Sequence, residues 1–371
     1  MKILLLGDAS NYHRALSVGL VRRGHSVTLA SDGSRWMGTE RDIDVSRPNF
    51  SGPLGGAAFV LKFRNLLRRE FRGYDVVQLA APTFATLRPS RLRPIFNELR
   101  RRNGSVFLTA LGTDSLYVKT LTGPTPPLRY SEWHLGDGAV GAMSEEARRA
   151  WLEPKLSEYT DFVYDSVDGV VSALYEYHAV VSAARPDVPL AYGGIPIDLQ
   201  SLPAKAERQS GPLRIYAAAH LGREREKGAD VLFPIVREFA AAHPGRVEIV
   251  EPPNMPYREF LNFLGGVDVL VDQLYSYTPA TSALLAMAMG AVAVTGGEPE
   301  YAEFIGEKEA LPLINVSPYE PQALGDSLGL LLKNRELLAD TGHRAAEFVA
   351  RHNSADVVAA RFEDFWQRRM K

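Results

Sequence analysis

The sequence predicts an α/β protein made of two Rossmann-like, doubly wound parallel-sheet domains that face a cleft. Three observations predict this fold. Short apolar segments of strand length alternate with helical segments, which is typical of parallel sheets. A polar stretch with two prolines and a glycine, residues 199–212, interrupts the alternation as a linker does. The length of 371 residues suits about two domains.

The first half of the chain, residues 1–198, carries the pattern of one such domain. Residues 2–7 form a buried apolar strand, residues 11–23 a helix that Gly24 ends, and residues 25–31 the next strand. Further short apolar strands are expected at residues 76–79, 106–109, 169–172 and 188–192.

After the linker the alternation restarts, and we expect a second domain at residues 213–355. Residues 356–371 are expected to form a C-terminal helix that crosses back to the first domain. The strands of the second half are expected at residues 213–219, 247–250, 267–271 and 291–295, and its helices at 228–242, 256–264, 281–289, 321–332 and 335–351.

Composition excludes several classes of site. The chain has no cysteine, so disulfides, thiolate nucleophiles and cysteine-based metal sites are excluded. The longest apolar run, residues 283–294, is interrupted by Gly290 and is too short for a membrane span. The first apolar segment is also too short for a signal peptide. We therefore expect a cytoplasmic protein.

Several common motifs are absent. No G-x-G-x-x-G follows the first strand, which argues against a dinucleotide-dependent dehydrogenase, and there is no Walker A sequence. The eight histidines show no H-x-x-x-H spacing, so no metal site is expected. The absence of G-x-S-x-G weakens a hydrolase interpretation.

The loop after the first strand is a candidate binding site. Ser10 and Asn11 stand where a strand ends and a helix begins, so they can bind a ligand hydroxyl or act as plain helix caps. His13 lies in the first helical turn, where the helix dipole lowers the pKa of an imidazole and favours a neutral general base. The alternative for His13 is a partly exposed residue without a role.

A second candidate in the first half is Asp114, which follows the strand at residues 106–109. A carboxylate at this strand end can orient an acceptor hydroxyl. The alternative is an aspartate that caps a turn or a helix.

The loop that opens the second half is rich in charge. Arg223, Arg225 and Lys227 lie between glycines at a strand end, and such cations suit a diphosphate. The alternative is a solvated charge run that Glu224 and Glu226 balance.

The next strand end is rich in hydroxyl groups. Tyr277, Thr278, Thr281 and Ser282 surround the start of a helix, where free N–H groups attract phosphate. Two further carboxylates, Glu298 and Glu300, follow the next strand and its two glycines, and they can hold ribose or sugar hydroxyls.

Residues 62–102 are strongly basic, with eleven Lys and Arg against three Asp and Glu, so that this segment carries +8 and the remainder −10. Phe63, Leu66, Leu67 and Phe71 recur among the arginines at helical spacing. This pattern predicts either a surface for anionic lipid or core-facing helices with solvated arginines. No groove with interleaved aromatics is evident, so nucleic acid is not expected.

In the second half the motifs resemble the donor domain of GT-B glycosyltransferases, most of all the family-4 group of retaining enzymes. The segment from Gly222 to Asp230 is similar to the family's G-R-…-E-K-G-x-D, and residues 283–290 are similar to L-E-A-M-A-x-G. Residues 109–114 resemble T-x-H-G-x-D, and residues 194–198 resemble the N-G-I-D before the linker.

The chain departs from the family at three positions. Tyr277 and Leu285 stand where the family carries two glutamates, and Leu111 stands where it carries a histidine. The resemblance therefore predicts a divergent branch whose donor recognition differs and whose stereochemistry is open. Glu298 and Glu300 are candidates to replace part of the missing carboxylate function.

The resemblance implies a mechanism without metal or other cofactor. The second domain would hold a nucleotide diphosphate-sugar, with the basic loop and the helix start at residues 278–282 stabilising the leaving diphosphate. The acceptor, a glycan or lipid-linked molecule, would bind near Ser10 and Asn11, with His13 and Asp114 as catalytic residues. The basic segment would bring the protein to the inner face of a membrane.

The resemblance thus predicts a hexosyl-type glycosyltransferase of envelope polysaccharide or glycoconjugate synthesis. Two alternatives stay open. One is a non-catalytic sugar- or nucleotide-binding protein of the same fold, and the other is an epimerase-like enzyme acting on the nucleotide sugar itself.

Overall fold

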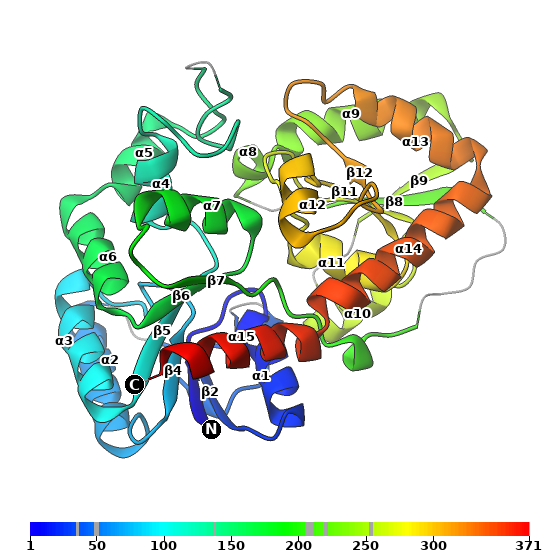
Figure 1. Cartoon of the computed structure of the whole chain (residues 1–371). Coiled ribbons are helices and arrows are strands. Elements are labelled where there is room, and N and C mark those ends of the chain that lie inside the picture. Colours follow the sequence, from blue (N-terminus) through cyan, green and yellow to red (C-terminus); the bar gives the residue numbers. More distant parts are fainter. Residues whose placement is uncertain are drawn as a thin grey trace. The chain divides into compact units, whose positions relative to one another are not determined.

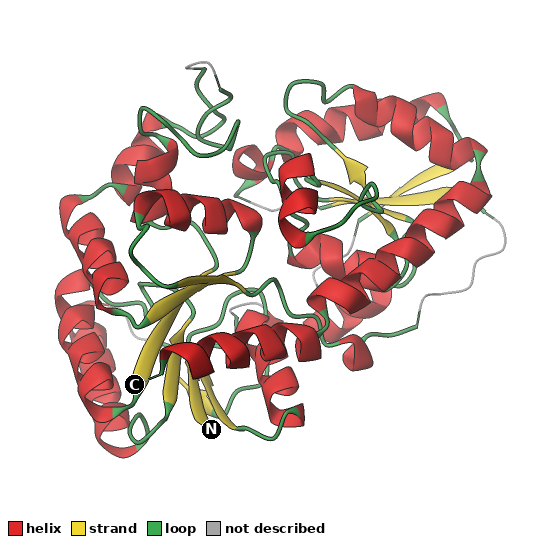
Figure 2. Ribbon diagram, in the orientation of Figure 1, coloured by secondary structure: helices red, strands yellow, loops and turns green. Residues whose placement is uncertain are grey.

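The computed structural model describes residues 1–34, 37–47, 52–136, 139–204, 211–218, 222–251 and 255–370, without the side chains of residues 52–54. The chain forms two compact units, each with yellow strands flanked by red helices in Figure 2. The first unit comprises Met1–Pro127, Glu145–Pro196 and Ala355–Lys371, and the second comprises Leu128–Ser144 and Ile197–Ser354. Within the predicted linker, residues 205–210 lie outside the described part of the chain.

The first unit is built on a seven-stranded sheet in which every strand pair is parallel (Figure 1). The first strand, β1, pairs with β2 on one side and with β4 on the other. In sheet order the strands are β3 (Ile43–Asp44), β2 (Ser26–Ser31), β1 (Lys2–Leu6), β4 (Val76–Leu79), β5 (Ser105–Ala110), β6 (Gly169–Ser172) and β7 (Leu190–Tyr192).

Side chains of this sheet alternate between two covered faces. Val106 and Leu108 of β5 join the core cluster that contains Phe63. Phe107, between them, packs its ring 5.8 Å from the ring of Phe365 on the opposite face. The period of two explains why the strands read as continuous apolar runs, because both faces are buried. The helices of the unit are α1 (Tyr12–Arg22), α2 (Gly52–Arg69), α3 (Pro89–Arg102), α4 (Ser115–Leu121), α5 (Glu145–Trp151), α6 (Pro154–Ser166), α7 (Tyr175–Ala184) and α15 (Ala355–Arg369).

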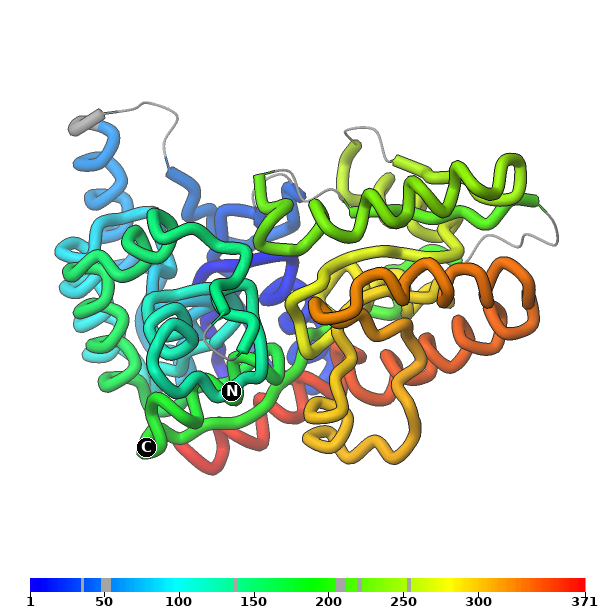
Figure 3. Tube along the Cα trace, turned by 90° about the horizontal axis from the view of Figure 1, so that it is seen from above, coloured from blue at the N-terminus to red at the C-terminus, as the bar shows by residue number. Residues whose placement is uncertain are grey.

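The last helix, α15, packs along α1 in the first unit, red beside blue in Figures 1 and 3. The two helices approach closely at Gly19, where an added Cβ would lie 2.2 Å from the carbonyl oxygen of Ala355. Trp366 is fully buried, and its indole N–H donates to the Gln78 side chain of β4 at 3.0 Å.

The second unit contains a five-stranded parallel sheet in the order β12 (Ile314–Asn315), β11 (Val292–Thr295), β10 (Val269–Val271), β8 (Leu213–Ala217) and β9 (Val247–Val250). Ile215, Val271 and Val294 belong to one core cluster with helices on one face, and Tyr216 packs against Phe263 on the other. The helices are α8 (Glu224–Lys227), α9 (Ala229–Ala242), α10 (Tyr257–Leu264), α11 (Thr281–Ala288), α12 (Pro299–Ile305), α13 (Ala323–Lys333) and α14 (Arg335–Asn353).

The units differ from the predicted domains mainly in one segment, and also at residues 197–198, which belong to the second unit, and at residue 355, which belongs to the first. Residues 128–144, which we assigned to the first domain from the sequence, pack in the second unit, although the chain on both sides of them belongs to the first. Residues 355–371 pack in the first unit. Over the described ranges, none of the helices combines the length and the apolar character that a membrane crossing requires.

Candidate functional site

The sheet of the second unit has a switch point between β8 and β10. The chain begins this sheet with β8, places β9 on one side of it and places β10 on the other. Ligands of open parallel sheets bind outside the carboxyl ends of the strands at such a reversal. The loops at residues 222–228 and 272–277 follow these two strands, so they form the first part of the candidate site.

Lys227 joins the two loops. Its carbonyl accepts a hydrogen bond from Leu274 N–H at 2.8 Å, and its ammonium donates to Gln273 Oε1 at 2.5 Å. The next residue, Gly228, has a φ of 71°, and a Cβ there would lie 2.5 Å from the Leu274 Cβ, so the close approach requires glycine. Burial and the charge of Arg223 lower the pKa of Lys227.

The other two predicted cations are placed differently. Arg223 pairs with Glu226, with 2.9 Å between Nε and Oε2, and Arg225 is exposed. Glu224 accepts a hydrogen bond from Gly222 N–H at 3.0 Å. Some of the charged residues in this loop therefore pair with each other, whereas the Lys227 side chain points toward the strand ends.

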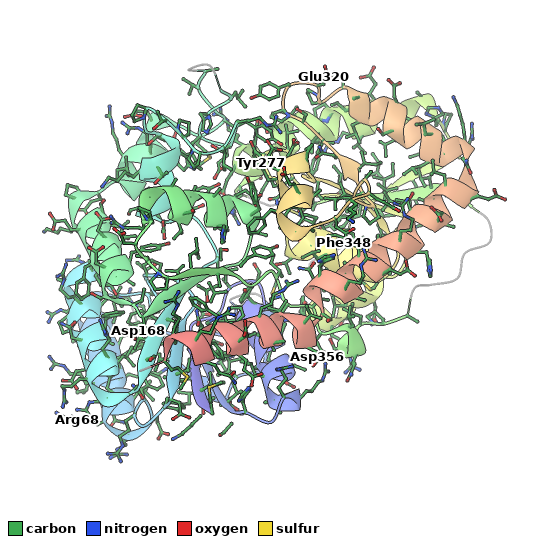
Figure 4. The ribbon with its side chains drawn as sticks, viewed as in Figure 1. Arg68, Asp168, Tyr277, Glu320, Phe348 and Asp356 are labelled. Atoms are coloured by element: carbon green, nitrogen blue, oxygen red, sulfur yellow. The ribbon has the colours of Figure 1, made fainter. Side chains whose placement is uncertain are left out.

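The loop before α11 buries two of the predicted hydroxyl residues. The side chains of Tyr277 (labelled in Figure 4) and Thr278 are buried, whereas those of Thr281 and Ser282 are half-buried in the first turn of the helix. The helix begins after Ala280, and no side chain caps it. Its first N–H groups and its dipole are therefore suited to an anion.

Two glycines bring the loop after β11 close to this turn. An added Cβ at Gly296 would lie 1.7 Å from the Ser276 carbonyl oxygen, and one at Gly297 would lie 2.6 Å from the Leu313 side chain. Glu298 N–H then donates to the Tyr277 carbonyl at 3.2 Å. The glycines thus place Glu298 beside the start of α11.

The carboxylates of Glu298 and Glu300 both bind Arg129. The guanidinium forms an ion pair with each of them, including a hydrogen bond of 3.2 Å from Arg129 Nη2 to Glu300 Oε2. These bonds hold the pKa of Glu300 below its usual range. Glu298 also accepts from the Tyr130 hydroxyl at 2.8 Å and from Asn315 Nδ2 at 3.0 Å.

Sequence reasoning missed four of these residues. Gln273 follows the end of β10 and Asn315 is the last residue of β12, so the strand-end pattern that located the other loops also pointed to these two residues. Arg129 and Tyr130 carried no such signal, because they lie 169 and 168 residues before their partner Glu298 and in the half of the chain that we assigned to the first domain.

In the first unit the loop after β1 holds a strained backbone. Within the described residues, the non-glycine residues with positive φ are Ser10 (53°), Asn11 (65°) and Ser34 (53°). They meet where Asn11 N–H donates to Ser34 Oγ at 3.2 Å. The Ser10 side chain is exposed, and the Asn11 side chain makes no cap bond to α1. Strain of this kind gathers at functional sites.

His13 is fully buried, so the partly exposed histidine that we considered from the sequence does not occur. Its Nδ1 lies 2.7 Å from the Gly7 carbonyl oxygen and therefore carries the proton. Its Nε2 lies 3.5 Å from Thr109 Oγ1, which accepts from Gln78 Nε2 at 2.9 Å. Burial lowers the pKa of His13 to about 4, so the ring is neutral near pH 7.

Asp114 caps helix α4. Its Oδ1 accepts from Tyr117 N–H at 2.9 Å, and its Oδ2 accepts from the Tyr164 hydroxyl at 2.9 Å. It borders a cavity of about 10 Å³, room for one water, that Tyr177 also lines. Burial raises the pKa of Asp114 to about 6. The structure therefore gives Asp114 the capping contacts of the alternative that we raised from the sequence.

No group of three or more His, Asp and Glu able to hold a metal ion occurs among the described residues. The described contacts of the site are therefore those of cationic side chains, hydroxyls, carboxylates and backbone N–H groups.

Known sequences and known structures compare differently with this chain. No protein-family model and no curated protein matches it. Sucrose-phosphate synthase from Thermosynechococcus elongatus is similar in structure, with a TM-score of 0.63, 12% identity and 99% of each chain covered. HepE from Anabaena, in complex with UDP-glucose, has a TM-score of 0.61 and 12% identity, with 99% of this chain and 100% of HepE covered.

A protein from Listeria monocytogenes assigned as a UDP-N-acetylglucosamine 2-epimerase is also similar, with a TM-score of 0.55, 12% identity and coverage of 98% of this chain and 94% of that one. These likenesses confirm the predicted α/β fold and the resemblance to GT-B glycosyltransferases. At identities this low, what the chains share is the fold.

Proposed function

We propose that the protein is a glycosyltransferase that moves a sugar from a nucleotide diphosphate-sugar to a glycan or lipid-linked acceptor. One observation carries the proposal. The switch point of the second unit brings the Lys227 loop to a tyrosine- and hydroxyl-rich turn before the uncapped start of α11, in a fold shared with HepE, whose structure contains UDP-glucose.

The donor diphosphate is assigned to Lys227 and to the first turn of α11. A cation and free N–H groups stabilise the negative charge that develops on the leaving diphosphate, and they need no reorganisation as the bond breaks. Arg223 and Arg225 are exposed, so solvent screens their positive charges more strongly than that of Lys227. Thr281 and Ser282 add hydroxyl donors beside the same turn.

The acceptor is assigned to the loop at Ser10 and Asn11 in the first unit. His13 acts there as a positioning residue, because its ring fixes the Gly7 carbonyl and faces Thr109 from within the core. Asp114 has its two carboxylate oxygens on Tyr117 and Tyr164, so its role is also to position the strand end.

A membrane-bound acceptor is part of the same proposal. Exposed arginines lie on α2 (Arg64 and Arg68), just after it (Arg72) and on α3 (Arg91). Such a face attracts the anionic headgroups of a cytoplasmic leaflet. An enzyme of envelope polysaccharide or glycoconjugate synthesis would meet a lipid-linked acceptor at such a surface.

Calorimetric titration with a panel of nucleotide sugars, UDP-glucose included, tests the donor site. We expect Lys227→Ala to weaken binding of the recognised donor about 10- to 100-fold, since hydrogen bonds to charged groups contribute about 1.5–3 kcal/mol. Arg225→Ala should weaken it less, because that side chain is exposed. Lys333→Ala, an exposed lysine on α13, is the matched control.

Unchanged affinity in both the Lys227 and Arg225 variants would overturn the donor assignment. Release of nucleotide diphosphate from the bound donor separates a transferase from a non-catalytic binding protein. The likeness to the Listeria monocytogenes protein favours the epimerase as the second candidate. Product analysis decides between them, because an epimerised product keeps its nucleotide.

A further inference from the structure

The segment at residues 128–136, which we call the strap, lies in the second unit between two stretches of the first. It is an irregular connection, yet most of its side chains are deeply buried. The buried members are Leu128, Tyr130, Ser131, Glu132 and Trp133. Connections normally run over a protein surface, so such burial calls for an explanation.

The strap is held at both ends. The Tyr277 hydroxyl accepts from the backbone N–H groups of Arg129 at 2.8 Å and of Tyr130 at 3.2 Å. The rings of Tyr130 and Tyr277 lie 4.8 Å apart. At the other end, the Tyr319 hydroxyl donates to the Leu135 carbonyl at 2.9 Å.

Charged side chains of the strap interact with residues that we assigned to donor binding. Arg129 binds the two carboxylates, Glu298 and Glu300, that can accept sugar or ribose hydroxyls. Glu132 is the weakest of three carboxylates, after Asp272 and Glu226, whose negative charge acts on Lys227, the cation assigned to the diphosphate. The strap thus offers hydrogen-bond donors to the carboxylates and a negative charge near the cation, as the hydroxyls and the diphosphate of a nucleotide sugar do.

The docked strap is also imperfectly satisfied. Trp133 Nε1 and His134 Nε2 are buried, and neither has a hydrogen-bond partner among the described residues. A buried polar group without a hydrogen-bond partner is unfavourable, so both side chains disfavour docking. The Arg129 side chain is 49% exposed and that of Glu300 is 33% exposed, so water competes for their ion pair. These features keep the docked state from being strongly favoured.

We propose that the strap closes the donor site, and that the hydroxyls of the nucleotide sugar compete with Arg129 for Glu298 and Glu300. The competition rests on the proposed function, whereas the docking of the strap stands on the contacts alone. Donor binding then requires release of the strap, which lowers the apparent affinity by the fraction of molecules that are closed.

Because the chain lacks cysteine, a single Ser131→Cys substitution makes the strap the only site of thiol labelling. Ser131 is 1% exposed, so a maleimide reacts there only when the strap opens. We expect Arg129→Ala to speed labelling about tenfold, and Tyr130→Phe, which removes one bond to Glu298, to speed it less. Ala293→Cys, buried in β11, is the matched control and should stay slow in both backgrounds.

Saturating UDP-glucose, or the panel member that calorimetry selects, should speed thiol labelling of the Ser131→Cys protein. Arg129→Ala should tighten binding of that donor severalfold. Binding with an unchanged or slower labelling rate would overturn the competition and leave the proposed function standing. Binding of no nucleotide sugar to either the natural or the Arg129→Ala protein would overturn both, even where Arg129→Ala speeds labelling. Equal labelling rates with and without Arg129 would overturn the closure itself.

Discussion

The stability of the first unit depends on pH through the buried carboxyl group of Asp114. Burial raises its pKa from 3.8 to about 6 in the folded chain. Between these values the folded state keeps a proton that the unfolded state has lost. The contribution of Asp114 to stability is therefore full below pH 3.8 and is lost as the pH rises through 6.

Asp114→Asn removes this titration and keeps an oxygen to accept from Tyr117 N–H. We expect the melting temperature of Asp114→Asn to rise relative to the unmodified protein by a few degrees between pH 4 and pH 7, measured by scanning fluorimetry. Asp114→Ala should melt lower at every pH, because a lost helix cap costs about 1 kcal/mol. A difference between Asn and Asp that stays constant over this range would contradict the assigned titration.

The packing of helices α2 and α3 determines which side chains of the basic segment are exposed. Phe63, Leu67 and Phe71 belong to the core cluster of the first unit, and Leu66 packs against it, so the apolar side of the predicted amphipathic pattern is not available to lipid. The arginines remain on the outside, and Figure 4 labels Arg68 at the edge of the unit. The proposed contact with lipid would therefore be electrostatic.

Co-sedimentation with vesicles tests this electrostatic contact. We expect binding to phosphatidylglycerol vesicles but not to phosphatidylcholine vesicles, and we expect it to fall steeply as salt rises from about 0.05 to 0.5 M, since salt screens exposed charges. Arg68→Glu with Arg72→Glu should abolish it. The matched control is Arg237→Glu with Arg258→Glu, the same charge change on exposed arginines of the second unit. Equal, negligible sedimentation with both lipids would exclude the surface.

Elements were largely predictable from the sequence, whereas side-chain pairing was not. The strands at residues 2–7 and 291–295 read as apolar runs because both faces of a parallel sheet are buried, and β1 and β11 lie there. The candidate loops followed from where those strands end. The pairing of Arg129 with Glu298 did not follow, because no periodicity or local motif reports a contact across 169 residues of chain.

At the scale of the whole molecule, the first unit is assembled from three separate stretches of chain. Its last stretch, α15, covers the face of the sheet that α2 and α3 leave open, through Phe365 against Phe107 and through Trp366 against Gln78. The stability of strands near the N-terminus therefore depends on residues more than 250 positions later, while the sheet of the second unit has its own core.

Trp366→Ala tests this division. A fully buried aromatic replaced by alanine costs about 3–5 kcal/mol, a large part of the stability of a typical domain. We expect amide hydrogen exchange to accelerate in β1, β4 and β5 and to stay unchanged in β8, β10 and β11. Arg369→Ala, at the end of the same helix, should leave both sheets protected. Because the proposed donor site lies within the second unit, we expect Trp366→Ala to retain nucleotide-sugar binding while the first unit loosens. Faster exchange in both sheets alike would show that the two units unfold as one.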